Sequence, residues 1–269
     1  MTLILTWLFP EGIVMGADSA VTQTVPSPSG RGERRILTGY RKVYKIQKLK
    51  AGISCWGTGK IGEYRTDIWL SDFISSRESE YDSIHSFAML LQDELRDLIP
   101  EITAPEGTME YRYGNRGFHL AGYIEYEGNK VPTFYHIHNG QSEIYPDINP
   151  RVINANQDLP PQEVLDLFSK NQAPHVRNGD FFFYTILFNT LNELFVQFYR
   201  RIRIGDTPFV FPNIPKFEEP LEGYSEFVRF WIRLVRDVYA LSNMPEVIGG
   251  NISILSISPD GIMNLTSKP

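Results

Sequence analysis

The sequence has only one cysteine, Cys55, among its 269 residues. A single thiol cannot form an intramolecular disulfide or build a cysteine-rich zinc site, and we therefore expect a protein of the reducing cytoplasm. Basic residues are also scarce, because 26 Lys and Arg residues face 32 Asp and Glu residues and leave a net charge of −6. Proteins that hold nucleic acid by its phosphates carry a basic excess instead, so we expect no nucleic-acid partner.

Long apolar runs are missing as well. The longest, such as residues 181–188, fall far short of the ~18 apolar residues that cross a bilayer as a helix. No basic segment precedes the first apolar residues, Leu3 to Leu5, as it does in a secretory signal. We therefore expect neither a membrane-spanning helix nor a signal peptide, and the 42% hydrophobic content is enough for a folded core.

Strands and helices are predicted in alternating blocks. Short apolar runs between Gly, Pro and Asn turn residues predict strands, at residues 3–9, 13–17, 43–49, 51–56, 117–124, 131–137, 142–145 and 252–257. Apolar residues that recur three and four positions apart predict helices, at residues 64–73, 84–98, 161–168, 181–203 and 225–241. The segment 23–39 is rich in Pro, Gly, Ser and Arg, and we expect a mobile surface loop there.

Both blocks of strands carry apolar faces that must be buried. The economical way to bury them is to stack two sheets and cover each with a layer of helices, which is a four-layer αββα sandwich of the α+β class. No repeat or linker divides the chain, so we expect a single domain over residues 1–269.

Four short motifs stand at informative positions in this order of elements. They are Thr2 at the start of the first strand, Gly16-Ala17-Asp18-Ser19 after the second, Arg41-Lys42-Val43-Tyr44-Lys45-Ile46, and the stretch from Gly52 to Gly59. Together they resemble the proteasome β-subunit family of N-terminal-nucleophile hydrolases and its bacterial relatives. The resemblance covers most of the chain and implies the same αββα sandwich.

The resemblance also implies a reaction centred on Thr2. Once Met1 is removed, the Thr2 hydroxyl would attack an amide carbonyl, with the α-amino group of Thr2 itself as the base. Lys42 would make the surroundings of the hydroxyl electropositive, and Asp18 would pair with Lys42 and orient it. The backbone N–H of Gly57 would form the oxyanion hole.

The function implied is that of a threonine hydrolase that cleaves peptide or other amide bonds by acyl transfer. The backbone at Thr22 would pair with an extended substrate strand, and the chemistry would need no cofactor or metal. The family usually assembles into rings, so we expect a homo-oligomer and allow for an unfoldase or activator partner. Two alternatives remain open: a non-catalytic subunit that serves assembly or partner binding, and an amidohydrolase of a small metabolite.

Each candidate also has a simpler interpretation. Thr2 suits a strand by its β propensity, Asp18 suits a turn, and Lys42 suits a solvated strand edge. Lys45 is the reserve candidate for the catalytic lysine. Cys55 is expected to be a small core residue and not a nucleophile.

Histidines offer little support for a metal site. His136 and His138 alternate on one predicted strand, but no carboxylate or third histidine stands at a ligand spacing nearby. We expect these two side chains to lie at the hairpin surface or to pack.

The sequence departs from the family in its loops and in two serine motifs. Insertions are expected near 23–39 and 205–222, which would reshape contacts between subunits. Asn178-Gly179-Asp180 stands where the family has a serine between glycines, and Ile248 stands where it has a serine before the last hairpin, although Gly249 and Gly250 keep the glycines of that motif. Asp180 or Glu246 would then have to support the threonine amine.

Overall fold

A computed structural model describes residues 2–25, 33–57, 59–61, 64–98, 116–139, 153–179, 182–201, 217–242 and 248–269. Within these segments, none of the helices combines the length and the apolar character that a membrane span requires. The predicted strand at 142–145 and most of the predicted insertion at 205–222 lie outside the described residues.

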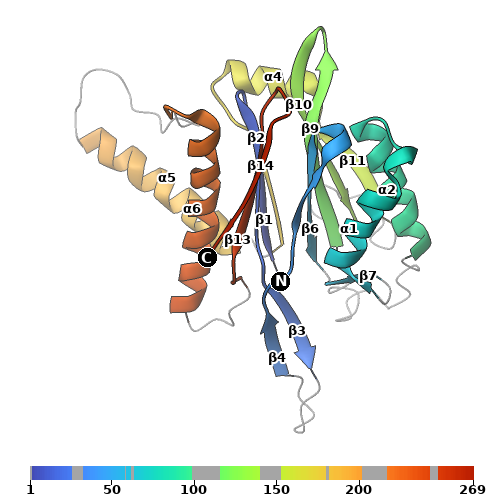
Figure 1. Cartoon of the computed structure of the whole chain (residues 1–269). Helices are drawn as coiled ribbons and strands as arrows, with labels where there is room; N and C mark the ends of the chain where they lie inside the picture. The colour runs from blue at the N-terminus through green and yellow to red at the C-terminus, as the bar shows by residue number, and fades with distance from the viewer. Residues whose placement is uncertain are drawn as a thin grey trace.

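Two five-stranded antiparallel sheets form the centre of the molecule (Figure 1). The first sheet has the order β12-β1-β2-β13-β14, with bounds His175–Gly179, Leu3–Phe9, Gly12–Asp18, Ile252–Ile257 and Met263–Lys268. The second has the order β11-β10-β9-β6-β5, with bounds Asn154–Leu159, Asn129–His138, Arg116–Tyr126, Ala51–Gly57 and Val43–Ile46. Every residue of β1 and β2 is buried, as expected of strands covered on both faces.

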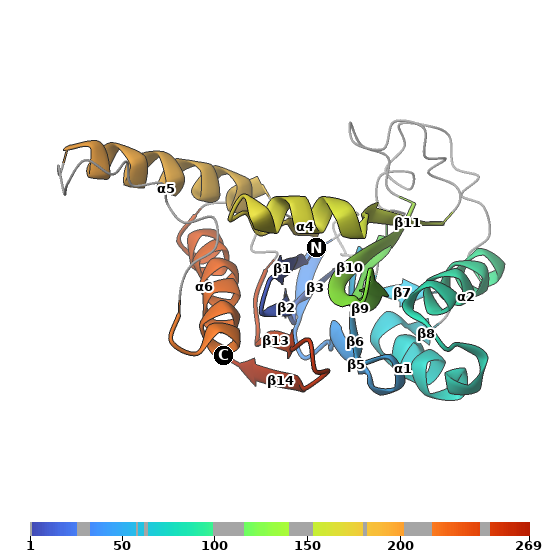
Figure 2. The ribbon, with the colours of Figure 1, turned by 90° about the horizontal axis from the view of Figure 1, so that it is seen from above.

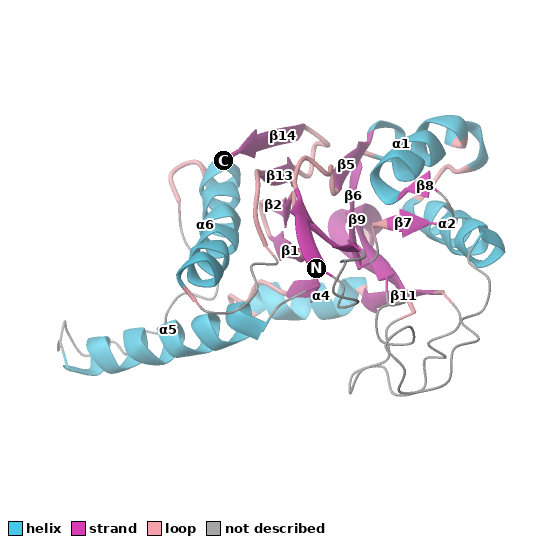
Figure 3. Cartoon of the chain, turned by 90° about the horizontal axis from the view of Figure 1, so that it is seen from below, coloured by secondary structure: helices cyan, strands magenta, loops and turns pink. Residues whose placement is uncertain are grey.

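Helices cover the outer face of each sheet, as Figures 2 and 3 show from above and below. The first sheet packs against α5 (Phe182–Arg201) and α6 (Pro220–Leu241), and the second against α1 (Thr66–Ser76) and α2 (Ile84–Leu98). A separate apolar cluster that includes Ile4, Met15 and Phe134 lies between the two sheets. The predicted αββα sandwich is therefore confirmed.

Several elements extend this plan. The helix α4 (Pro161–Ser169) contacts β10, and short 3-10 turns lie at Gln47–Leu49 and Glu78–Glu80. Figure 2 shows α5 reaching away from the body of the molecule. The helix α6 begins at Pro220, five residues before its predicted start, because proline is favoured in the first turn, where its missing N–H is not needed.

The expectation of a loop throughout residues 23–39 is wrong. Strands β3 (Val21–Val25) and β4 (Glu33–Leu37) pair as an antiparallel hairpin that projects beyond the two sheets (Figure 1). A hairpin of this kind does not need a continuous apolar face, which is why a search for buried strands misses it. A second small pair, β7 (Lys60–Ile61) and β8 (Tyr64–Arg65), precedes α1.

Candidate functional site

The site forms where the first two strands begin and end. Thr2 directly precedes β1, and Asp18 is the last residue of β2. Because the two strands are antiparallel, with Ile4 opposite Ala17, the start of one lies beside the end of the other. Thr2 and Asp18 are 3% and 1% exposed, so two polar residues are buried side by side.

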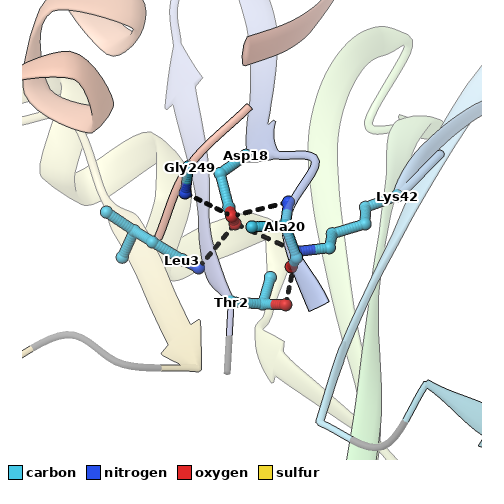
Figure 4. A network of polar contacts seen from close by, with 6 residues as sticks. All are labelled: Thr2, Leu3, Asp18, Ala20, Lys42 and Gly249. Atoms are coloured by element: carbon cyan, nitrogen blue, oxygen red, sulfur yellow. Dashed lines mark hydrogen bonds and ion pairs between the residues drawn. The ribbon is translucent and has the colours of Figure 1, made fainter. Parts of the chain in front are cut away.

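Asp18 is the hub of the site (Figure 4). Its carboxylate accepts hydrogen bonds from the backbone N–H of Leu3 at 3.0 Å, Ala20 at 3.0 Å and Gly249 at 3.2 Å. It also pairs with the Lys42 ammonium at 3.1 Å. A buried carboxylate with four donors is fully solvated by the protein, and its orientation is fixed by three separate segments of the chain.

Lys42 links this carboxylate to the threonine (Figure 4). Its Nζ donates to the Thr2 Oγ1 at 2.5 Å, to Asp18 at 3.1 Å and to the carbonyl oxygen of Ala20. An ammonium has three N–H groups, so all of them are used. Burial lowers the pKa of Lys42 below its ordinary value, while the charge of Asp18 opposes that change.

The two remaining predicted residues belong to different elements. Gly57 ends β6 with φ +93°, and it lines the same small cavity as Thr2 and Lys42. Thr22 lies in β3, opposite Ile36 of β4. Among the described strands, only β4 pairs with β3, which leaves one edge of β3 without a strand neighbour.

Gly179 is part of the site, although the sequence pattern does not single it out. It ends β12 opposite Leu3 with φ +89°, and a Cβ added to it would overlap the Thr2 carbonyl oxygen. Asn178 and Gly179 lie just before the predicted helix at 181–203, and the structure places both of them in a strand. The Asn-Gly dipeptide is the available signal, since it marks backbone that turns sharply.

Gly249 is a second contributor, because its N–H holds Asp18 and its carbonyl oxygen accepts from Ser19 N at 3.2 Å. It belongs to the pair of glycines that the sequence shares with the family motif before the last hairpin. The two acidic residues considered as substitutes for the missing serines, Asp180 and Glu246, lie outside the described residues.

Lys45, the reserve candidate for the catalytic lysine, is engaged elsewhere. The Nζ of Lys45 donates to the Met263 carbonyl oxygen at 2.8 Å. Cys55 is buried, and burial raises the pKa of its thiol to about 12, so it is a neutral packing group. His136 and His138 are both buried and stack with ring centroids 3.8 Å apart. The prediction that they pack is therefore confirmed, and the alternative that they lie at the hairpin surface is wrong.

Across the described segments, no group of three or more His, Cys, Asp and Glu side chains is arranged to hold a metal ion. The Thr2 hydroxyl lies beside the buried Lys42 ammonium, and a positive charge at that distance lowers the free energy of the deprotonated hydroxyl.

Comparisons with known proteins identify the fold. No family model matches the sequence. No curated protein matches it either. Among solved structures, a Gly-1 mutant of Anbu from Hyphomicrobium sp. strain MC1 matches all of this chain and 87% of its own, with a TM-score of 0.52 at 12% identity. Anbu, an ancestral beta-subunit, from Yersinia bercovieri matches the same shares with a TM-score of 0.51 at 14% identity. This chain therefore has the fold of the Anbu proteins.

Proposed function

We propose that this chain is a proteasome-like threonine hydrolase that cleaves peptide bonds, or other amide bonds, through Thr2. The observation that carries the proposal is the 2.5 Å hydrogen bond from the Lys42 Nζ to the Thr2 Oγ1, in a site where Asp18 holds Lys42. The shared fold with the Anbu ancestral beta-subunit supports it. Removal of Met1 leaves Thr2 as the first residue and frees its α-amino group.

The reaction divides into acylation and deacylation. In acylation, the Thr2 Oγ bonds to the substrate carbonyl carbon while its proton passes to the α-amine of Thr2. The C–N bond then breaks, and the departing amine takes that proton. In deacylation, a water oxygen bonds to the acyl carbon, the α-amine accepts a water proton, and the Oγ regains a proton as the ester bond breaks.

Three residues stabilise the charges that form in these steps. The Lys42 ammonium lies against the Oγ and lowers the free energy of the alkoxide, and Asp18 keeps that ammonium in place. The N–H of Gly57 donates to the oxyanion that forms on the substrate. One donor of this kind commonly contributes on the order of 10²–10³-fold to kcat.

Intact-mass analysis with a peptide epoxyketone tests the proposal, because that electrophile needs both a hydroxyl and a free α-amine on the same residue. We expect loss of Met1 and one adduct that maps to Thr2. Thr2→Ala should remove the adduct and amide hydrolysis, while Thr133→Ala, a buried threonine in β10 outside the site, should keep both. Retained Met1 with no adduct would contradict the proposal and favour a non-catalytic subunit.

The proposal includes assembly with further copies of the chain. Ile186 and Leu194 are 46% and 54% exposed on α5, eight positions apart and therefore on one face, and Phe230 on α6 is 51% exposed. Sedimentation velocity should report an oligomer, and glutamate at both Ile186 and Leu194 should shift it toward monomer. A wild-type monomer at micromolar concentration would contradict this part of the proposal.

A further inference from the structure

A small cavity lies directly beside the proposed nucleophile. It has a volume of about 20 Å³, and its lining includes Thr2, Gly57, Tyr40, Cys55 and Asp67. One water molecule needs roughly 10–15 Å³ of such space, so this cavity has room for a group of one or two heavy atoms. A larger group would have to push the walls apart.

The position of the cavity decides which part of a substrate would reach it. The attacked carbonyl carbon must lie at the Thr2 Oγ, with its oxygen toward the N–H of Gly57. The residue that owns that carbonyl, termed the acyl-side residue, has its Cα one bond away. Since Thr2 and Gly57 both line the cavity, the side chain of the acyl-side residue is the group that enters it.

One wall of the cavity is held by backbone hydrogen bonds. It is formed by the first turn of α1, where the Thr66 N–H donates to the Gly59 carbonyl oxygen at 3.0 Å. The hydroxyl oxygen of Tyr44 lies 2.8 Å from the carbonyl oxygen of Asp67 and 2.8 Å from that of Arg41, so its one proton is shared between these two acceptors. One phenol therefore connects the helix to the segment that carries the catalytic lysine.

Side chains at the rim hold the same wall. Arg65 forms a two-point ion pair with Asp67, at 3.0 Å from its Nε and 2.6 Å from its Nη2. Its guanidinium also lies over the Tyr40 ring, 4.2 Å from the centroid. Widening the cavity would break several of these contacts together, so the walls resist a larger side chain.

The charged groups that line the cavity are already engaged. Arg41 donates its Nε to the Val43 carbonyl oxygen at 3.1 Å, and its guanidinium lies over the Tyr44 ring, 4.6 Å from the centroid. Asp67 is already paired with Arg65, and Lys42 is paired with Asp18. Cys55 contributes an uncharged thiol, because burial raises its pKa. A lysine side chain of a substrate would therefore lose its hydration without gaining a carboxylate partner, while a glutamate side chain is too long for the cavity.

We infer that the substrates of this chain are peptides cut after a small uncharged residue, alanine or serine, and that Cys55 and the Arg65–Asp67 pair set this limit. The inference rests on the proposed function, because it assigns the acyl-side pocket of the same site. Valine, leucine, phenylalanine, glutamate and lysine are excluded by size, and lysine also by its charge. Glycine is tolerated but leaves the cavity unfilled.

The rate of adduct formation gives the sharpest test, because it needs no particular leaving group. Two peptide epoxyketones that differ only in the residue next to the reactive ketone, alanine or leucine, are compared on the full-length protein by intact mass. We expect the alanine compound to react about tenfold or more faster, the scale of an overpacking penalty. Fluorogenic peptides with alanine, serine, leucine, phenylalanine or lysine at the same position should rank in the same order in kcat/KM.

Variants of Cys55 connect the preference to the cavity. Cys55→Val replaces the sulfur with two methyl groups and so fills more of the cavity. We therefore expect reaction with the alanine compound to fall several-fold while the glycine analogue keeps its rate. Cys55→Ala enlarges the cavity, and the penalty on leucine should shrink. The matched control, Ser54→Ala, changes the neighbouring buried residue of β6, which does not line the cavity, and should leave the ratio unchanged.

The outcomes separate this inference from the function on which it rests. Thr2-dependent adducts that form equally fast with alanine and leucine would overturn the inference and leave the proposed function standing. A lack of adduct with every compound would overturn the proposed function and the inference with it. A changed ratio in Ser54→Ala equal to that in the Cys55 variants would overturn the assignment to the cavity.

Discussion

The backbone of Gly179 lies against the carbonyl of Thr2 so closely that no side chain fits between them. The contact follows from the pairing of β12 with β1, in which Gly179 is opposite Leu3. The positive φ of +89° at Gly179 is a second reason for glycine, since side chains disfavour that conformation. One residue from the second half of the chain thus sets the position of the residue we propose as the nucleophile.

Gly179→Ala should displace Thr2 and abolish most amide hydrolysis. We expect at least a hundredfold loss in kcat/KM, because a shift of about 1 Å at a reacting group costs on that order. Gly128→Ala is the matched control: Gly128 has φ +78° but open space at its Cβ, so it carries the conformational cost of about 1 kcal/mol without the overlap. Equal activity in the two variants would show that the overlap does not matter.

Much of the fold could be predicted from local pattern. The strands at β1, β2, β6, β9, β10 and β13 and the helices α2, α4 and α5 lie within a few residues of their predicted positions, because each buries a strongly apolar face. The strands β11 and β12 were missed for the opposite reason. Residues 154–159 and 175–179 are polar, and only the sheet edges beside them make them strands.

The sequence predicts the three side chains at the centre of the candidate site, but it does not predict the backbone groups that hold them in place. Thr2, Asp18 and Lys42 stand at recognisable spacings, and the structure brings all three together. The contributions of Gly179 and Gly249 come from backbone atoms. The sequence marks both as glycines, but their contacts with Thr2 and Asp18 depend on long-range strand pairing and cannot be read from residue type.

Asp18→Asn should shift the pH dependence of the reaction. The charge of Asp18 raises the pKa of Lys42 against the lowering effect of burial, so its removal lets that pKa fall further. The mechanism needs Lys42 protonated, and activity is lost as pH rises through its pKa. The alkaline limb of the kcat/KM profile should therefore move to lower pH.

The control for this change is Asp72→Asn, an exposed carboxylate on α1 for which no change is expected. Asp18→Asn should also lower the free energy of unfolding by roughly 3 kcal/mol, because it leaves a buried ammonium without its partner. An alkaline limb that stays in place in Asp18→Asn would show that Asp18 does not hold Lys42 in its charged form.

The buried histidine His119 should make the fold sensitive to acid. Its Nδ1 lies 2.9 Å from the Thr6 Oγ1, across the interface between the two sheets. Burial lowers the pKa of His119 to about 3, so below pH 6.5 the unfolded chain binds a proton that the folded chain does not. The contribution of His119 to the free energy of unfolding therefore decreases as the pH is lowered, by about 1.4 kcal/mol per pH unit between about pH 6 and pH 4.

Thermal unfolding measured from pH 7.5 to pH 4.5 tests this prediction. His119→Gln should lower Tm at neutral pH by losing packing, but its Tm should fall less steeply with acid than that of the wild type. His85→Gln, a change at an exposed position on α2, should keep the wild-type slope. Parallel slopes for wild type and His119→Gln would rule out this source of acid sensitivity.

Cys55 should be nearly inert toward alkylation in the folded protein. Burial raises its pKa from an ordinary 9.0 to about 12, although the charge of Lys42 opposes the shift, and only the thiolate reacts. Near pH 8 the thiolate fraction is then about a thousandfold smaller than that of an exposed cysteine, so iodoacetamide should modify Cys55 roughly a thousandfold more slowly in native protein than in concentrated guanidinium chloride. Thr2→Ala should react at the same native rate as the wild type, because the nucleophile does not hold the thiol. Native alkylation as fast as that of the unfolded chain would mean that the cavity wall opens freely, which would also remove the basis for a limit on the size of the acyl-side residue.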